Sequence, residues 1–179
     1  MAFFEVPKDE ELPPESRKML EEYQRGTGTK DVARTWKVYG RFPKIIEARL
    51  LAWKNLSQDR SFSWDARMVA VMLIAHAKRC QACFAGARFQ LDKLGFDEGA
   101  MDAMCAHPDT LPLKERDRLL VHHVLRIATD SANLTSKDFQ EMADHGFSKD
   151  EIQEMVAFAA YWNMNMVFSQ AALAGLTEE

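Results

Sequence analysis

The sequence predicts an all-α protein, and three observations agree on this. Apolar residues recur at helical spacing along most of the chain, helix start and stop signals bracket these stretches, and no segment shows the alternation typical of a β-strand. Of the 179 residues, 47% are hydrophobic, which is enough to build a buried core. We therefore expect one helical domain over residues 13–179, with about six to eight helices, preceded by a loosely attached segment over residues 1–12.

Proline and glycine mark the ends of the first helices. Pro14 stands where the first turn of a helix tolerates proline, and Gly28 follows the helix that this proline opens. Gly40 closes a second short helix, and Pro43 opens a third. We therefore expect helices over residues 15–24, 30–39 and 43–56.

The central part of the sequence contains the longest stretch without such signals. Ser63 can cap a helix, and between residues 64 and 94 Gly86 is the only glycine or proline. One straight helix of that length would need intermediate caps, so we expect a break near residues 78–80. The basic residues at this break suit a helix C-terminus, where the carbonyls carry partial negative charge. Gly95 ends the helix that follows the break.

Capping signals divide the C-terminal half of the chain into four helices. Asp97 and Pro112 stand at two helix starts, and Thr135 and Ser148 each begin a capping box with an acidic residue three positions later. These signals predict helices over residues 97–107, from Pro112 to at least Ile127, over residues 135–145 and over residues 148–174.

Two of the helix junctions share one residue pattern. Leu94–Asp97 and His145–Ser148 each place a glycine and a phenylalanine before a residue that can cap the next helix. We interpret this as one helix-turn-helix device used twice, through common capping chemistry or through duplication. His107 and His145 are both predicted to stand at helix ends.

Composition and charge exclude several classes of function. The net charge is −4 and no basic tract is longer than Lys78-Arg79, which disfavours nucleic acid as a partner. The N-terminus lacks the basic and apolar regions of a signal peptide, and no apolar stretch is long enough to cross a membrane. We therefore expect a soluble cytoplasmic protein without a membrane partner.

The segment Cys80-Gln81-Ala82-Cys83 carries the strongest chemical signal in the sequence. In a reducing compartment, a Cys-x-x-Cys in a chain of three cysteines favours redox chemistry or metal binding over a structural disulfide. At a helix start, beside Lys78 and Arg79, one thiol would be shifted toward thiolate. A redox-active dithiol is our main hypothesis, and a pair of small buried core residues is the alternative.

The sequence offers little support for a metal or another cofactor. Zinc sites need about four ligands, and there is no second pair at metal-ligand spacing. His122 and His123 are adjacent, so on a helix they point about 100° apart. Phe84 follows Cys83, which excludes the haem-attachment pattern Cys-x-x-Cys-His. We expect neither a metal nor a cofactor.

Several other polar residues are candidates for a role in a site. His76 precedes Cys80 by four residues and could serve the thiols as a base if the helix were unbroken, or could face solvent. Cys105 is predicted to be a small core residue. Asn163 and Asn165 lie in the apolar final helix, where they could line a pocket, cross a subunit interface or bond within the chain.

The order of these motifs is similar to that of a known superfamily. From about Phe42 to Leu176 the chain resembles the carboxymuconolactone decarboxylase and AhpD-like alkylhydroperoxidase superfamily. The matching segments are Asp65–Ala75, Cys80–Cys83, Leu94–Phe96, Leu113–Arg116, Leu134–Thr135, His145–Ile152 and Ala159–Asn165.

The resemblance implies an all-α AhpD-like fold, assembly as trimers or hexamers, and a thiol-dependent peroxidase of the antioxidant type. Its substrates would be a hydroperoxide or a disulfide, and a thiol protein would reduce it. By this analogy Cys83 attacks the peroxide and Cys80 resolves the product. Two alternatives remain: a non-catalytic binding or scaffold protein of the same fold, and a small-molecule decarboxylase of the carboxymuconolactone type.

The sequence departs from the family at its proton relay. In family members with the dithiol, a glutamate lies twelve residues before the first cysteine and a histidine four residues after the second, and often another histidine lies between them. Met68, Ala87 and Ala82 occupy these three positions here. General-base assistance commonly contributes ~10²–10⁴-fold to a rate, so we expect a slower peroxidase than one with the relay.

Overall fold

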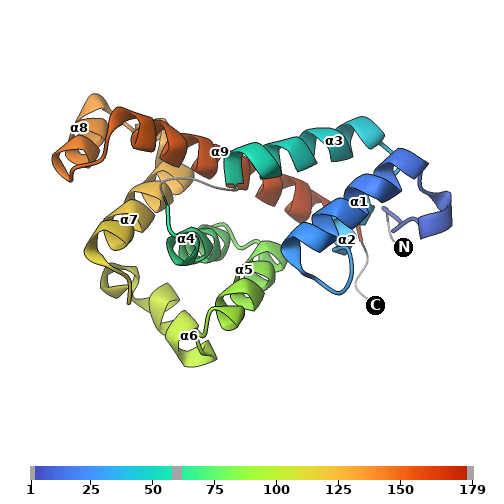
Figure 1. Ribbon diagram of the computed structural model, residues 1–179, viewed down its shortest axis with the longest axis horizontal. Helices are drawn as coiled ribbons and strands as arrows, with labels where there is room; N and C mark the ends of the chain where they lie inside the picture. Colours follow the sequence, from blue (N-terminus) through green and yellow to red (C-terminus); the bar gives the residue numbers. More distant parts are fainter. Residues whose placement is uncertain (1–2, 58–61, 177–179) are drawn as a thin grey trace. The chain divides into compact units, whose positions relative to one another are not determined.

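A computed structural model describes residues 3–57 and 62–176 of the chain (Figure 1). These residues form nine α-helices and no strand, which confirms the all-α prediction, and one of the nine, α2, is a single turn of four residues. The helices are α1 (Pro14–Thr27), α2 (Arg34–Lys37), α3 (Pro43–Ala52), α4 (Trp64–Ala77), α5 (Gln81–Lys93), α6 (Glu98–Ala106), α7 (Glu115–Asp130), α8 (Ser136–Asp144) and α9 (Lys149–Gly175).

The chain divides into two compact units, the first built from residues 1–55 and 167–179 and the second from residues 56–166. Residues 1–2 of the expected N-terminal segment lie outside the described residues. Within the first unit, Leu12 is buried in a small core with Leu20, Trp36 and Ile46. The backbone N–H of Phe4 also donates to the carbonyl of Gly175, at 2.7 Å.

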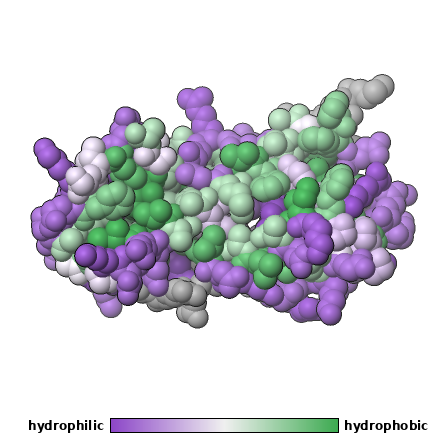
Figure 2. Space-filling view, turned by 90° about the horizontal axis from the view of Figure 1, so that it is seen from above, coloured by the Kyte–Doolittle hydropathy of each residue, from purple (hydrophilic) through white to green (hydrophobic). Residues whose placement is uncertain are grey.

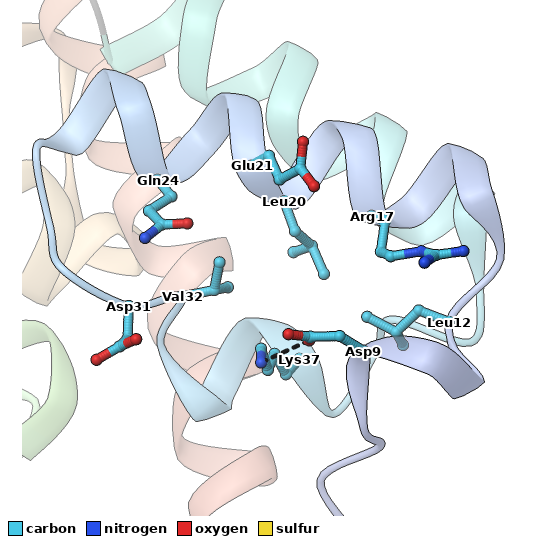
Figure 3. Close-up of a pocket in the computed structure, with 9 residues that line it drawn as sticks. All are labelled: Asp9, Leu12, Arg17, Leu20, Glu21, Gln24, Asp31, Val32 and Lys37. Carbon is cyan, nitrogen blue, oxygen red and sulfur yellow. Dashed lines mark ion pairs between the residues drawn. The ribbon is translucent and has the colours of Figure 1, made fainter.

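A buried arginine and a small pocket are the notable features of the first unit. Arg49 is 1% exposed, and its guanidinium lies 3.9 Å from the ring centroid of Trp36, a cation–π contact. A pocket of about 130 Å³ has Leu20 and Val32 on its wall and the ion pair between Asp9 and Lys37, 2.7 Å long, at its edge (Figure 3).

Helix α4 forms the centre of the second unit, where it contacts α5, α6 and α7 (Figure 1). Residues 68–75 are all buried, so this helix is apolar on every side, as expected of a helix enclosed by others. Its start is fixed by Ser63, whose hydroxyl accepts the backbone N–H of Ala66 at 3.2 Å. The dithiol therefore follows the most buried helix of this unit.

Several helix boundaries differ from the sequence prediction. The second helix spans only Arg34–Lys37 rather than residues 30–39, and the Lys30 carbonyl, which lies before it, accepts a hydrogen bond from the Gln24 side chain. The third α-helix ends at Ala52 rather than at residue 56, and a π-helical turn over Trp53–Ser57 follows it. Helix α7 begins at Glu115 and not at Pro112. The capping boxes at Thr135 and at Ser148 are present as predicted.

Three helices of the second unit end in the same hydrogen-bonded turn, a Schellman motif. In each turn one residue has a positive φ, and the next residue donates its N–H to the carbonyl five positions earlier. The residues with positive φ are Arg79 (56°) after α4, Gly95 (89°) after α5 and Gly146 (82°) after α8. The donors that follow them are Cys80, Phe96 and Phe147.

The predicted similarity of the junctions Leu94–Asp97 and His145–Ser148 is confirmed by these turns. At each junction the residue after phenylalanine caps the next helix: the Asp97 carboxylate accepts the Ala100 N–H, and the Ser148 hydroxyl accepts the Glu151 N–H. The predicted break at residues 78–80 is a third turn of this kind, in which Cys80, the residue after the positive φ, is itself the N-cap of the next helix.

Candidate active site at the Cys80–Cys83 dithiol

The turn after α4 places Cys80 at a position that this motif normally fills with a buried apolar residue. Its N–H donates to the Ala75 carbonyl at 2.9 Å, while the corresponding donor after α8 is Phe147, which is 4% exposed. Cys80 is also the N-cap residue of α5, with φ −85° and ψ 89°, and Cys83 lies in the first turn of that helix. Cys80 thus belongs both to the turn that ends α4 and to the cap of α5, and Cys83 belongs to the first turn of α5.

The two sulfur atoms face each other. Cys80 Sγ and Cys83 Sγ are 2.7 Å apart, closer than two sulfurs in van der Waals contact and farther apart than in a disulfide bond, and both cysteines are free thiols. Residues three apart inside a regular helix keep their Cβ atoms about 5–6 Å apart, too far for a relaxed disulfide. The extended backbone of Cys80 removes this restriction, so the pair can meet without unwinding α5.

The two cysteines differ slightly in solvent exposure. Cys80 is 0% exposed and Cys83 is 8% exposed, and both belong to the main hydrophobic cluster of the second unit. A reagent that comes from solvent therefore meets Cys83 first, and Cys80 lies behind it.

The pKa of Cys80 is low for a buried thiol. The pKa of Cys80 is lowered to about 7, mainly by the hydrogen bond with the Cys83 side chain; burial opposes this and the Cys83 backbone N–H adds to it. Lys78 and Arg79, which we expected to acidify the thiols, are not among these causes. The acidity comes instead from the contact between the two cysteines.

His76 lies on the solvent side of the turn. It is exposed, and its ring contacts the Phe84 ring at a centroid distance of 5.8 Å. Within the described residues it makes no hydrogen bond to either sulfur. Because α4 ends between His76 and Cys80, the two residues do not share the face that an unbroken helix would have given them. The guanidinium of Arg88 also lies near Phe84, 5.4 Å from its ring centroid.

The positions of the family's relay are apolar and close-packed. Met68 on α4 is 4% exposed and Ala87 on α5 is 3% exposed, and both lie in the same cluster as the two thiols. Ala82, between the cysteines, is half-buried. The dithiol is thus surrounded by hydrocarbon where the resemblance would place a carboxylate and an imidazole.

A second polar contact of the core was not predicted from the sequence. His123 Nε2 and His145 Nδ1 are 2.9 Å apart, although the residues are 22 positions apart in the chain. Burial is the main cause that lowers the pKa of His123, and the nearby His145 adds to it. His122 instead bonds the Pro108 carbonyl through Nε2 at 2.7 Å, so the adjacent histidines diverge as predicted.

The remaining candidates have ordinary structural surroundings. Cys105 packs against the main cluster, and burial raises the pKa of its thiol. Asn163 donates through Nδ2 to the Ala128 carbonyl at 3.0 Å, one of the options that its sequence context left open. Among the described residues, no three histidine, cysteine, aspartate or glutamate side chains gather in a way that could hold a metal ion.

Comparison with known proteins identifies the fold. No family model matches the chain, and no curated protein matches it. Solved structures do match, among them the alkylhydroperoxidase AhpD core, an uncharacterized peroxidase-related protein from Ralstonia eutropha JMP134, and an uncharacterized peroxidase-related protein from Silicibacter sp. TM1040. The first has a TM-score of 0.80 at 18% identity and covers 95% of this chain and 89% of its own.

The second neighbour has the same TM-score of 0.80 and the same identity of 18%, and covers 99% of this chain and 92% of its own. The protein thus has the fold of the AhpD-like, peroxidase-related proteins, which confirms the predicted resemblance at the level of structure. A search for membrane-spanning segments among the described helices finds none of sufficient length and hydropathy.

Proposed function

We propose that the protein is a thiol-dependent peroxidase or disulfide oxidoreductase whose redox centre is the Cys80–Cys83 dithiol. The observation that carries this proposal is the contact of 2.7 Å between two free thiols, together with a Cys80 pKa of about 7. The peroxidase-related proteins that share the fold support the same class of chemistry.

The peroxidase reaction would proceed in two steps. The thiolate of Cys83, the sulfur that solvent reaches, attacks one peroxide oxygen, which cleaves the O–O bond; Cys83 becomes a sulfenic acid and the released alkoxide is protonated to an alcohol. Cys80 then attacks the Cys83 sulfur and expels hydroxide, which is protonated to water. In total, the dithiol and one hydroperoxide give the disulfide, an alcohol and water.

The contact between the two sulfurs favours formation of a thiolate, which is part of what a proton relay would do. Because the two sulfurs are in contact, proton transfer between them would move the negative charge from Cys80 to Cys83, the less buried of the two, near neutral pH. The apolar residues at the relay positions provide no general base, which lowers the expected rate by ~10²–10⁴-fold. A thiol protein that reduces the disulfide, and His76 as an auxiliary base, also remain part of this proposal.

Assembly as a homo-oligomer, a trimer or a hexamer, belongs to the proposal as well. From Met155 to Thr177 the sequence contains no charged residue, and Val156, Met164 and Val167 of α9 are exposed by 37%, 37% and 66%. Hydrophobic patches are visible on the face that Figure 2 shows. Sedimentation velocity on the full chain would measure the assembly, and a monomer at all concentrations would contradict it.

The test of the redox proposal is oxidation of the reduced protein by an organic hydroperoxide. We expect alkylation and peptide mass spectrometry to find a Cys80–Cys83 disulfide. Cys83→Ser should abolish peroxide consumption, Cys80→Ser should accumulate a sulfenic acid on Cys83, and the matched control Cys105→Ser should behave like the parent. Peroxide consumption by Cys83→Ser at the parental rate would contradict the proposed roles.

A non-catalytic protein of the same fold is the second candidate, favoured by the burial of Met68 and Ala87 at the relay positions. Titration of the thiols distinguishes the two candidates. A lowest thiol pKa near or above the free value of ~8.5 would support the non-catalytic protein, because neither sulfur would then be a substantial thiolate near neutral pH.

A further inference from the structure

The segment around the dithiol differs in charge from the rest of the chain. Between Asp65 and Asp92 the sequence contains no acidic residue, although the chain as a whole carries a net charge of −4. The cations of this segment are Arg67, Lys78, Arg79 and Arg88. The dithiol thus lies in a basic segment of an acidic protein.

Arg79 is the member of this group that is placed to meet an incoming molecule. It is exposed, directly precedes Cys80, and its guanidinium makes no hydrogen bond or ion pair with any residue that the structure describes. Arg88, by contrast, is held on the surface by ion pairs with Glu98 and Asp102.

The backbone at Arg79 adds a second observation. Its φ of 56° lies in the left-handed region, where the equivalent turns after α5 and α8 have Gly95 and Gly146. Glycine adopts this conformation without steric cost, whereas arginine does not. Of the three turns, the one next to the thiols therefore has a charged residue, Arg79, at the position with positive φ, although arginine disfavours that backbone conformation.

The hydrogen bonds of Cys83 lower the pKa of Cys80, and Arg79 is not among the causes of that shift. A guanidinium that is exposed, available and next to the reactive pair can act instead on the reagent that approaches Cys83. Guanidinium groups bind carboxylates through paired hydrogen bonds, a geometry that a lysine does not reproduce.

We propose that Arg79 is a specificity-determining residue that favours carboxylate-bearing disulfides and thiols as exchange partners of the dithiol. This inference rests on the proposed redox function of Cys80 and Cys83. In the exchange, the Cys83 thiolate attacks one sulfur of the partner disulfide, forms a mixed disulfide and releases one partner thiolate. Cys80 then attacks Cys83 and releases the second, so two partner thiols and one protein disulfide are formed.

Three small disulfides of different charge test the proposal on the reduced full-length protein. They are anionic glutathione disulfide, neutral hydroxyethyl disulfide and cationic cystamine, and the rate of Cys80–Cys83 disulfide formation is measured by quenched alkylation and mass spectrometry. Each rate is divided by the intrinsic rate of a free model thiol with the same reagent. We expect glutathione disulfide to exceed cystamine by roughly threefold or more at low salt, and the preference to shrink as salt is added.

Variants at Arg79 separate recognition from folding. Arg79→Gly fits the left-handed backbone, so the turn stays intact while the charge is lost; we expect the anionic preference to disappear and the rate with the neutral disulfide to be unchanged. Arg79→Glu should reverse the preference, and Arg79→Lys should keep the charge effect without the paired hydrogen bonds. Lys149→Gln removes one exposed positive charge at the start of α9 and is the matched control for net charge.

The possible outcomes separate the role of Arg79 from the function of the dithiol. Equal normalised rates for all three disulfides in the parent, or equal losses in Arg79→Gly and Lys149→Gln, would overturn the role of Arg79 while the dithiol function stands. Failure of the parent to form the disulfide with any of the three reagents would overturn the proposed function, and this inference with it.

Discussion

The turn after α4 and the turn after α8 have the same backbone hydrogen bonds, but the side chain at the buried position is a thiol in the first and an aromatic ring in the second. After α8, Gly146 takes the positive φ and the next residue, Phe147, is buried at 4% exposure as an apolar anchor. After α4, Arg79 takes the positive φ and the next residue, Cys80, is buried at 0% exposure as a thiol. The comparison teaches that one capping motif can hold either a packing residue or a reactive group at its buried position.

Physical chemistry explains why the second use is possible. The buried position of a Schellman turn requires a side chain that tolerates hydrocarbon, and a thiol does so better than other nucleophilic groups. When this position is also the N-cap of the next helix, a second thiol in the first helical turn can reach it. The turn after α8 has a spacer, Ser148, before its next helix, and so it serves packing and capping alone.

The largest effect in this comparison is expected from removal of the apolar anchor. Phe147 packs edge-on against the His123 ring and lies beneath the Arg116 guanidinium, so Phe147→Ala leaves a cavity and should lower the free energy of unfolding by about 3–5 kcal/mol. Cys80→Ala removes a single sulfur atom and should cost about 1 kcal/mol. Urea denaturation of the reduced proteins measures both, and equal losses would show that the two buried positions are energetically alike.

The acidity of the dithiol is the next largest expected effect. With a Cys80 pKa of about 7, the rate of alkylation of the pair by iodoacetamide should reach half of its plateau near pH 7. Cys83→Ala removes the thiol that bonds Cys80 and leaves no donor in its place, so the midpoint should move up toward the ordinary value of ~8.5.

Cys105 is an internal control for this measurement, because burial raises the pKa of its thiol and its labelling should begin at higher pH than that of the pair. A parental midpoint that Cys83→Ala leaves in place would mean that the contact between the sulfurs is not the source of the low pKa.

Exchanging the residues with positive φ should change stability in opposite directions at the two turns. Gly146→Ala introduces a Cβ at φ 82° and should destabilise the protein by about 1–2 kcal/mol. Arg79→Gly relieves the same conflict at φ 56° and should stabilise it by up to about 1 kcal/mol, less than the steric term because glycine is more flexible when unfolded. Thermal unfolding of the two variants beside the parent gives both signs, and a loss of stability in Arg79→Gly would show that the arginine side chain contributes to packing.

The helix boundaries near these turns could be predicted because their causes are local. Glycine before phenylalanine predicted the turns at Gly95 and Gly146, and the basic pair at residues 78–79 predicted a break although no glycine marks it. The left-handed conformation of Arg79 could not be predicted, since arginine has no preference for it. The helix expected over residues 30–39 is wrong at both ends, since only Arg34–Lys37 is helical.

The residues of the candidate site could be predicted from the sequence, but the cause of the lowered pKa of Cys80 could not. Cys80 and Cys83 stand out in the sequence, but the dominant influence on their acidity is the sulfur–sulfur contact, which depends on the exact backbone of one residue. The adjacent cations were a reasonable sequence-based explanation that the geometry does not support. The His123–His145 pair had no sequence signal, because its members come from two helices that only the packing brings together.

The smallest effect is expected from the histidine pair beside the α8 turn. Burial and His145 lower the pKa of His123 below its ordinary value, so the unfolded chain binds a proton more readily than the folded one. This contribution to stability is complete above the unfolded pKa of ~6.5 and is lost as the pH falls through the lower, folded pKa. Glu141 and Asp138 favour the protonated form and His122 opposes it, but they act more weakly than burial. Between pH 8 and pH 5 the parent should therefore lose more stability than His123→Gln, which keeps a side chain able to bond His145. His107→Gln, at an exposed helix end, should follow the parent, and a parental pH dependence retained in His123→Gln would assign the effect to other groups.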